Sequence, residues 1–379
     1  MVRASFRLPG VLLSALLLAS TACGSVPFLK PGPAAPTGVG VQVHLWGYPE
    51  TTERDLRLAR EAGFTWVKQL FPWAFIEGDG KGRFEWQEPD RIVEAVNRAG
   101  LKLIVRLDMQ PAWARVDRVF PIVWPPDRLA DWGDFIYALS KRYKGRIAAY
   151  QIWNEPNLAR EWGGRPPNAA EYVRLLQVAY QAVKLGDPDA LVITAGLSPT
   201  TDLSDNARAD VVYLQEMYDA GAKGYFDLLG VNAAGFKAPP EADPAVVARD
   251  PTLTNHDPSK EELRRAYSFR HVEDLRAVME RNGDSERKIA ILEMGWTSDP
   301  RPDSPYHWHS VSEQEKADYL VRAIKYAREH WQAWLGPMIV WTLADPAWKP
   351  EHEQVYWAIT DPDGRPRPAY EALRQLLKS

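Results

Sequence analysis

Cysteine, excess basic charge and long apolar runs are nearly absent from this chain of 379 residues. A single cysteine excludes a disulfide framework, so we expect the stability to come from a large hydrophobic core. The 46 lysines and arginines are outnumbered by 50 aspartates and glutamates, so we expect no nucleic-acid partner. Beyond the first residues, no apolar run is long enough to cross a membrane as a helix.

The residues that are abundant indicate a globular protein. Apolar residues make up 45% of the chain and charged residues 25%, which excludes a disordered chain. Sixteen tryptophans are an unusual excess, and their positions are considered below.

The first residues resemble a bacterial export signal. Arg3 and Arg7 precede a short apolar run, and small residues follow it up to Cys23. This pattern predicts a secretory signal peptide over 1–22. The position of Cys23 resembles that of a bacterial lipobox, so we expect this cysteine to be acylated. The alternative is an ordinary secreted protein in which Cys23 lies just past the cleavage site.

The remaining chain divides into a linker and one large region. Residues 23–38 contain four prolines and predict an extended tether rather than a domain. Residues 39–379 are long enough for one α/β barrel with long loops. We expect this region to lie outside the cytoplasm as a monomer. It would be attached to the membrane through the lipid on Cys23 alone, and secreted if that lipid is absent.

Apolar runs and amphipathic segments alternate eight times from residue 39 onward. The runs predicted to be strands are 39–46, 65–70, 102–107, 148–153, 191–195, 228–232, 288–292 and 338–343. The segments predicted to be helices are 52–62, 89–98, 129–142, 172–183, 207–219, 261–281, 313–331 and 368–377. Nearly continuous apolar strands that alternate with helices are typical of a parallel sheet. Since no dinucleotide or phosphate-binding motif follows the first run, we predict a single-domain (β/α)8 TIM barrel rather than an open sheet.

One connection is unusually rich in proline. Residues 233–260 follow the sixth predicted strand and contain five prolines. Segments after the strands of a barrel lie at its C-terminal face, where active sites are built. We interpret 233–260 as a lid or the wall of a binding subsite, the alternative being a solvated insertion without a role.

Two glutamates follow predicted strands at the same end of this barrel. Glu155 comes directly after the fourth apolar run, and Glu293 comes directly after the seventh. Their side chains are therefore expected to converge over the barrel axis. Two facing carboxyl groups are what glycosidic cleavage requires, because one protonates the leaving oxygen and the other attacks the sugar. The alternative is a pair of rim carboxylates in structural ion pairs.

The sequence Trp153-Asn154-Glu155-Pro156, paired with Glu293, resembles the retaining glycoside hydrolases of clan A, especially families 39 and 5. The resemblance implies that Glu155 is the general acid/base and Glu293 the nucleophile, with carboxyl groups about 5–5.5 Å apart. It also implies that Asn154 binds the sugar 2-hydroxyl, that the substrate is an oligo- or polysaccharide, and that no metal or organic cofactor is needed.

The chain departs from this clan at two positions. Clan members usually have an arginine near the end of strand two, where this chain has Lys68. Lysine keeps the charge but lacks the planar fork that binds a carboxylate through two bonds, and Arg106 is a candidate to supply that role. Many members also have a tyrosine just after strand six that bonds the nucleophile. None stands there in this chain, and Tyr267 and Tyr306 are the candidate substitutes.

Many of the tryptophans are predicted to lie at or beyond the C-terminal ends of strands, where their faces could stack on sugar rings. The alternative for each is that it merely covers the top of the barrel. His44 lies late in the first strand, where it could bond a sugar hydroxyl or be a satisfied barrel histidine. The predicted substrate-binding residues are Asn154, His44, Trp46, Lys68, Trp73, Arg106, Trp296 and Trp341.

The sequence as a whole predicts a retaining glycoside hydrolase. Two alternatives remain open: a catalytically silent surface protein that binds glycans on the same barrel, and a transglycosylase. The pair His307 and His309 suggests a metal only weakly, because a third ligand in a fixed motif is missing.

Overall fold

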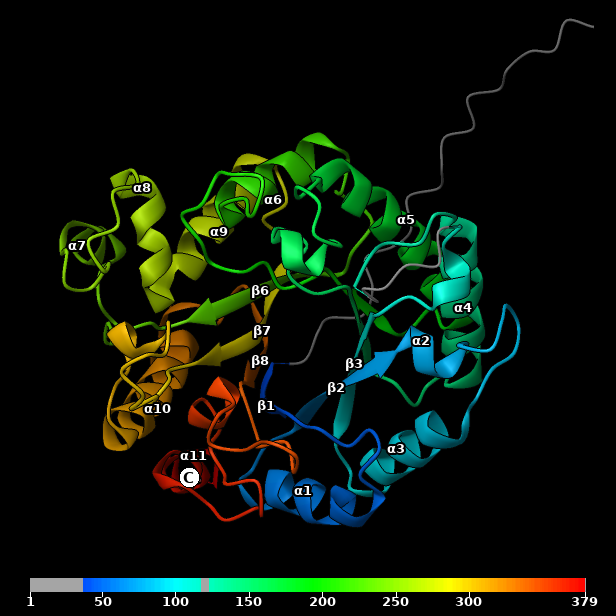
Figure 1. Ribbon diagram of the computed structural model, residues 1–379, viewed down its shortest axis with the longest axis horizontal. Coiled ribbons are helices and arrows are strands. Elements are labelled where there is room, and N and C mark those ends of the chain that lie inside the picture. Colours follow the sequence, from blue (N-terminus) through cyan, green and yellow to red (C-terminus); the bar gives the residue numbers. More distant parts are fainter. Residues whose placement is uncertain (1–36, 117–122, 379) are drawn as a thin grey trace, which may run out of the picture. The chain divides into compact units, whose positions relative to one another are not determined.

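The computed structural model describes residues 37–116 and 123–378, and within them the strands form one closed parallel barrel. The predicted signal peptide, Cys23 and nearly all of the tether lie outside the described residues. The strands follow one another around the barrel in chain order (Figure 1). They are β1 (Gly38–Gln42), β2 (Trp66–Pro72), β3 (Lys102–Asp108), β4 (Ala149–Ile152), β5 (Leu191–Ile193), β6 (Leu228–Ala234), β7 (Lys288–Gly295) and β8 (Leu335–Val340). The predicted (β/α)8 barrel is confirmed.

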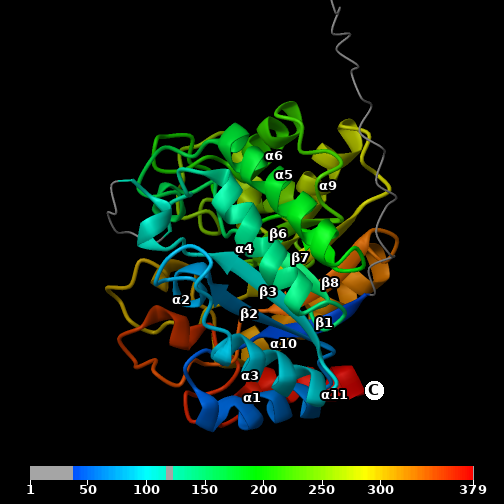
Figure 2. The same ribbon diagram turned by 90° about the vertical axis from the view of Figure 1, so that its right-hand side faces the viewer.

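The helices pack around the outside of the ring of strands (Figure 2). The longer ones are α1 (Pro49–Glu61), α3 (Gln87–Arg98), α4 (Leu129–Arg142), α5 (Ala169–Gly186), α6 (Asp210–Asp219), α9 (Val272–Arg281), α10 (Glu313–His330) and α11 (Pro368–Lys378). Three shorter ones lie in the connections: α2 (Trp73–Ile76), α7 (Pro244–Arg249) and α8 (Glu261–Arg264). In the part of the chain that the structure describes, no helix is both long and apolar enough to span a bilayer.

The prediction of one continuous helix over 261–281 is wrong. The chain forms α8, two short 3₁₀ turns and then α9. The break lies at Ser268, which has extended backbone angles of φ −124° and ψ 147°. This break turns Phe269 and His271 into the interior, where both are buried. The gain from burying these side chains outweighs the helical periodicity of the sequence.

His271 joins two outer helices through a buried charged contact. Its ring nitrogens lie 3.0 Å from Asp210 on α6 and 2.9 Å from Asp274 on α9. Burial opposes the charged form, but these two carboxylates outweigh it and raise the pKa of His271 to about 10.

Side chains that point into the barrel change from apolar to polar along the strands. A lower layer of apolar side chains fills the interior, formed by Trp66, Ile104, Ala149, Leu191, Ile193, Leu228, Ala290, Leu292 and Ile339. Residues two or four positions apart on a strand point to the same side of it. Lys68 follows Trp66 by two positions, Arg106 follows Ile104 by two, and Asn232 follows Leu228 by four. The barrel is therefore closed below by packing and polar at its C-terminal mouth, where a ligand can enter.

Candidate active site

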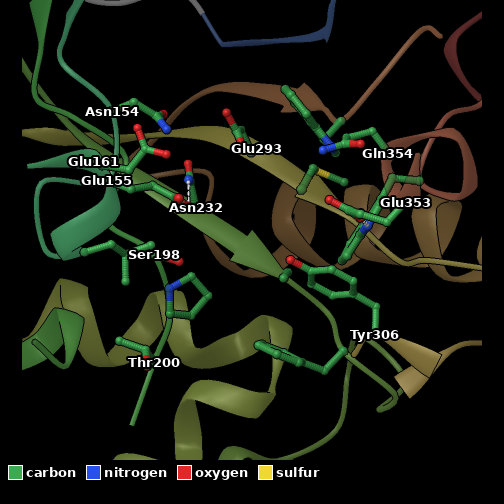
Figure 3. Close-up of a pocket in the computed structure, with 18 of the residues that line it drawn as sticks. Asn154, Glu155, Glu161, Ser198, Thr200, Asn232, Glu293, Tyr306, Glu353 and Gln354 are labelled. Carbon is green, nitrogen blue, oxygen red and sulfur yellow. Dashed lines mark hydrogen bonds between the residues drawn. The ribbon is translucent and has the colours of Figure 1, made fainter. Parts of the chain in front are cut away.

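A cavity of about 680 Å³ opens at the C-terminal mouth of the barrel (Figure 3). Its walls come from the ends of β3, β6 and β7 and from the segments after β4, β5, β6, β7 and β8. The residues that carry its polar and aromatic surface are Arg106, Asn154, Glu155, Arg160, Glu161, Ser198, Thr200, Asn232, Phe236, Glu293, Tyr306, His309, Trp341, Glu353, Gln354 and Trp357. Both glutamates predicted from the sequence line this one cavity.

The backbone after β4 is bent sharply to direct Glu155 into the cavity. Trp153 and Glu155 have φ angles of 70° and 37°, which residues other than glycine rarely adopt. Two contacts hold this conformation: the Trp153 indole donates to the Glu161 carbonyl at 2.8 Å, and the Glu155 amide donates to the Gly196 carbonyl at 3.2 Å. Backbone strain that is held in this way is a frequent property of functional sites.

Glu155 accepts hydrogen bonds from two donors, one of them buried and the other largely exposed. Asn232 donates from β6 at 3.0 Å, and Arg160 donates from the loop after β4 at 3.1 Å. Asn232 approaches this closely because residue 196 is glycine, where an added Cβ would lie 2.1 Å from the Asn232 oxygen. Asn232 is buried, whereas Arg160 is largely exposed and is screened by solvent.

The surroundings of Glu155 raise the pKa of its carboxyl group. Burial and the nearby charge of Glu293 raise the pKa of Glu155, while Arg160, Asn232 and Ser198 oppose the rise. A carboxylic acid with a raised pKa can hold a proton near neutral pH and give it to a leaving group.

Glu293 is directed into the same cavity by an irregularity in β7. Val231 of β6 pairs with Ile291, but the next residue, Asn232, pairs with Glu293, so Leu292 is an extra residue in the strand. Such a bulge re-aims the side chain that follows it. Leu292 can therefore fill the barrel while Glu293 faces the cavity beside Asn232.

Two cations face Glu293 from neighbouring strands. The Lys68 ammonium on β2 lies 2.8 Å from its Oε1, and the Arg106 guanidinium on β3 lies 4.0 Å from the same atom. Arg106 also pairs with Asp108 at 2.9 Å, so its charge is shared. Lys68 is completely buried, and burial lowers its pKa while Glu293 opposes that change. Lys68 thus directly contacts the Glu293 carboxylate.

Six of the eight predicted sugar-binding residues fall into three groups. Asn154, Arg106 and Trp341 line the cavity. Lys68 contacts Glu293 but is not part of the cavity wall. His44 and Trp46 lie outside the lining, with His44 bonded to the Thr342 hydroxyl at 3.1 Å and Trp46 packed against Phe71.

Two predicted sugar-binding tryptophans are structural instead. Trp73 and Trp296 have no exposed surface, so neither offers a face to a sugar ring. Trp73 stacks on Phe135 of α4, with ring centroids 5.3 Å apart. The Trp296 indole donates to the Ala238 carbonyl at 3.1 Å and packs beside Phe269. The prediction was wrong because both side chains point outward, between the strands and their helices.

The proline-rich segment 233–260 contributes only its beginning to the cavity. Ala234 and Phe236 line the wall, while the rest contains α7 and packs against neighbouring elements. Glu241 in this part pairs with Arg322 of α10 at 2.6 Å. The segment is therefore neither a lid over its whole length nor a solvated insertion.

Of the two tyrosines considered as substitutes, Tyr306 lines the cavity and its hydroxyl points inward (Figure 3). Tyr267 instead donates to Asp257 at 2.7 Å, away from the cavity. No group of three or more metal-binding side chains gathers anywhere in residues 37–116 and 123–378.

Several lining residues were not predicted from the sequence. Asn232 stands at the end of an apolar strand, and that position could have revealed it. Glu161 lies beside Glu155, and burial and the Glu155 charge raise its pKa to about 7. The others lie on loops or short 3₁₀ turns without a recognisable sequence pattern: Arg160, Ser198, Thr200, Phe236, Glu353, Gln354 and Trp357.

Comparisons with known proteins reveal the fold. No family model matches the chain, and no curated protein matches it. Among solved structures, a family 39 glycoside hydrolase from the gut symbiont Bacteroides cellulosilyticus WH2 is similar, with a TM-score of 0.64 and 19% identity. That match covers 90% of this chain but 63% of the other, so this chain spans less than two thirds of that protein. The chain therefore shares the (β/α)8 barrel fold of that protein.

Two further solved structures share this barrel. Xylanase 10B from Thermotoga maritima has a TM-score of 0.58 at 14% identity, covering 90% of this chain and 95% of that one. The exo-β-1,4-mannosidase Op5Man5 from Opitutaceae bacterium strain TAV5 has a TM-score of 0.60 at 16% identity, covering 93% and 61%. At such identities the likeness extends to the fold alone, so the chemistry must be argued from the cavity.

Proposed function

We propose that this protein is a retaining glycoside hydrolase that cleaves O-glycosidic bonds of an oligo- or polysaccharide by double displacement. The observation that carries the proposal is that Glu155 and Glu293 line one cavity in different electrostatic surroundings. Burial raises the pKa of Glu155, while Glu293 forms an ion pair with Lys68. One carboxyl group is thereby suited to give a proton, and the other to attack as an anion.

In the first step, the Glu293 carboxylate attacks the anomeric carbon of the bound sugar. The bond from that carbon to the leaving oxygen breaks, and Glu155 gives its proton to this oxygen. The sugar is then held as an ester of Glu293, and Glu155 is left as a carboxylate. Arg160 and Asn232 stabilise the charge that Glu155 acquires in this step.

In the second step, the Glu155 carboxylate takes a proton from water. The oxygen of that water attacks the anomeric carbon, and the bond to Glu293 breaks. Two inversions at one carbon give net retention. The Lys68 ammonium, 2.8 Å from Glu293, stabilises the carboxylate that is released.

We propose that Asn154 and Trp341 hold the sugar. Asn154 projects into the cavity beside Glu155 (Figure 3), where its amide can bond the 2-hydroxyl. Trp341 is partly exposed on the cavity wall and can stack on the ring. Arg106, which also lines the cavity, is proposed to contact a hydroxyl of the same substrate.

Hydrolysis of aryl glycosides and polysaccharides tests the proposal, with the stereochemistry of the first product followed by NMR. We expect a product with the substrate's anomeric configuration, and nearly complete loss of turnover in Glu155→Gln and Glu293→Gln. Glu94→Gln, an exposed position on α3, is the matched control and should remain active. Full activity in both cavity variants would overturn the assignment, and binding without turnover would favour the silent glycan-binding alternative.

We also propose that the protein is exported and attached to the membrane through a lipid on Cys23. The support comes from the sequence alone: the basic start, the apolar run and the cysteine that follows it. Metabolic labelling with a radioactive fatty acid tests this. Labelling of the natural chain but not of Cys23→Ser is the expected result, and equal labelling of both would contradict it.

A further inference from the structure

The connection from β8 to α11 builds the cavity wall that faces Glu155. Glu353, Gln354 and Trp357 lie on this connection, and Figure 3 shows Glu353 and Gln354 across the cavity from Glu155. Trp357 lies against the end of β7, where a Cβ added at Gly295 would be 3.5 Å from the indole, an ordinary contact distance. The wall therefore stands beside the strand that carries the nucleophile.

The side chains of this wall leave hydrogen-bonding groups for a ligand. The Trp357 indole donates to Glu353 Oε2 at 2.7 Å, which fixes the carboxylate against the ring. Among residues 37–116 and 123–378, no donor bonds the other carboxylate oxygen of Glu353, and no partner bonds the side-chain amide of Gln354. The Tyr306 hydroxyl points into the cavity from the neighbouring loop after β7 (Figure 3), and its ring lies 6.4 Å from that of Trp357. A carboxylate, an amide and an aromatic face together match the hydroxyls and apolar face of a sugar.

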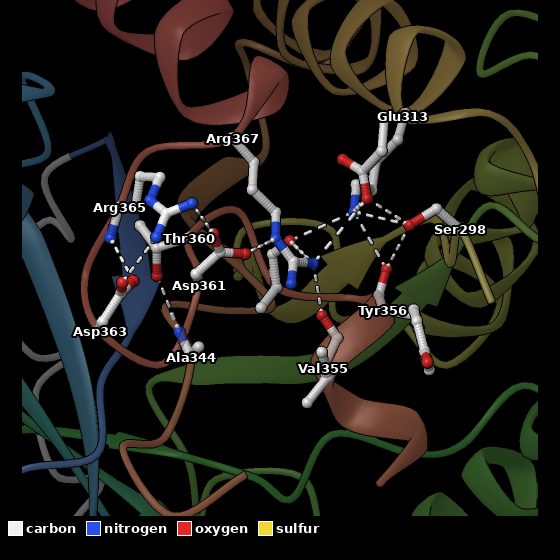
Figure 4. Close-up of polar contacts among 12 residues, drawn as sticks. Ser298, Glu313, Ala344, Val355, Tyr356, Thr360, Asp361, Asp363, Arg365 and Arg367 are labelled. Carbon is white, nitrogen blue, oxygen red and sulfur yellow. Dashed lines mark hydrogen bonds and ion pairs between the residues drawn. The ribbon is translucent and has the colours of Figure 1, made fainter. Parts of the chain in front are cut away.

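A buried lysine behind the wall holds its backbone in place, and its partners Ser298, Glu313 and Tyr356 are labelled in Figure 4. Lys316 on α10 has a side chain with no exposed surface, and it donates to the Tyr356 carbonyl at 3.0 Å and the Ala358 carbonyl at 3.2 Å. The same ammonium contacts Glu313 at 2.9 Å and the Ser298 hydroxyl at 3.1 Å. Lys316 therefore connects the wall to α10 and to the loop after β7.

A second cation holds the wall from the side of α11. Arg367 donates to the Val355 carbonyl at 2.6 Å and to Asp361 at 2.7 Å. Carbonyl oxygens of residues 355, 356 and 358 are thus all bonded to buried or partly buried cations. Burial lowers the pKa of Lys316 to about 8, while Glu313 opposes that change. Burying a charge costs free energy, and here the ion pair with Glu313 and the hydrogen bonds to two carbonyl oxygens offset that cost.

We propose that Glu353, Gln354 and Trp357 form a subsite for a second sugar unit of a neutral oligosaccharide, and that Lys316 is the positioning residue for this subsite. The inference rests on the proposed function, since it assumes that a sugar is bound between Glu155 and Glu293. The volume of about 680 Å³ lies within the range of about 300–1,000 Å³ that is typical of pockets for drug-sized ligands, so a ligand larger than one sugar ring can fit.

Kinetics with substrates of different length test the subsite. The probes are xylotetraose, cellotetraose and mannotetraose, each with the para-nitrophenyl glycoside of the same single sugar. For the pair that the natural enzyme cleaves, Glu353→Ala should lower kcat/KM on the tetraose about tenfold or more relative to the monoglycoside. Lys316→Met should give the same preferential loss, mainly through KM, because the wall is displaced and the two catalytic glutamates are not.

Arg276→Met is the matched control for loss of a buried cation. Arg276 is 8% exposed and donates to the Arg287 and Ser285 carbonyls, away from the cavity. The Arg276→Met variant should have a lower unfolding temperature, while the ratio of kcat/KM on the tetraose to kcat/KM on the monoglycoside stays unchanged. An equal loss on tetraose and monoglycoside in Glu353→Ala would overturn the subsite, and a preferential loss in Arg276→Met would overturn the role of Lys316.

Failure of the proposed function gives a different result. If the natural enzyme cleaves none of the probes, calorimetric binding of the three tetraoses decides on the subsite. Binding that Glu353→Ala weakens about tenfold would support it, and binding that is absent or unchanged would overturn it.

Discussion

Replacing Asn232 by alanine should move the pH dependence of hydrolysis to higher pH. Asn232 donates a 3.0 Å hydrogen bond to Glu155 and stabilises the ionised form of that carboxyl group. Without this donor, the ionised form is less stable and the pKa of Glu155 rises further above its ordinary value. The acid form that gives the proton then persists to higher pH, so the alkaline limb of kcat/KM shifts upward.

The size of this shift follows from the bond that is lost. A hydrogen bond to a charged group contributes about 1.5–3 kcal/mol. One pKa unit corresponds to about 1.4 kcal/mol, so we expect a shift of about one to two units. The neutral amide of Asn232 is buried, and solvent therefore screens its effect on Glu155 little.

The assay is the pH profile of kcat/KM for an aryl glycoside, measured for the natural enzyme and two variants. Ser198→Ala provides the comparison, since Ser198 also lowers the pKa of Glu155 and its loss should shift the limb in the same direction. An alkaline limb that stays in place or moves to lower pH in Asn232→Ala would refute the assignment of Glu155 as the acid.

Three other variants test separate parts of the structure. Lys68→Met should destabilise the fold by about 3–5 kcal/mol in chemical denaturation, because Glu293 loses its buried partner; an unchanged midpoint would contradict this. The raised pKa of His271, about 10, means that its stabilising charge is fully present below about pH 6.5 and is lost as the pH rises through 10. In His271→Gln, the unfolding free energy should therefore decrease less steeply over that pH range than in the natural protein. An equally steep decrease would show that another group causes it. Trp296→Ala should cost about 3–5 kcal/mol of stability. Its KM should stay unchanged under conditions where the variant is folded, and a raised KM would mean that the indole contacts substrate.

The strands could be predicted because each is a short apolar run between polar segments. Strands of a parallel barrel are buried on both sides, so little but apolar residues can occupy them. The helix over 261–281 could not be placed correctly, because its apolar spacing continues across Ser268 while burial of Phe269 and His271 breaks the helix. That burial is a tertiary effect, absent from local periodicity.

The site was predictable where a polar residue directly follows a strand. Glu155 and Glu293 do so, and both line the cavity. Trp73 and Trp296 also follow strands, but the prediction that they bind sugar was wrong. The end of a strand gives the height of a side chain along the barrel axis but not whether it points inward or outward. Glu353 could not be found, since a loop held by distant cations places it.

The central claim is that Glu293 forms a covalent bond to the sugar during turnover. Incubation with a mechanism-based fluorinated glycosyl fluoride should trap this ester, and peptide mass spectrometry should locate the added mass. We expect it on the peptide that contains Glu293, with no label in Glu293→Gln. A label on another carboxyl group, or no label in an enzyme that hydrolyses the matching glycoside normally, would contradict the mechanism.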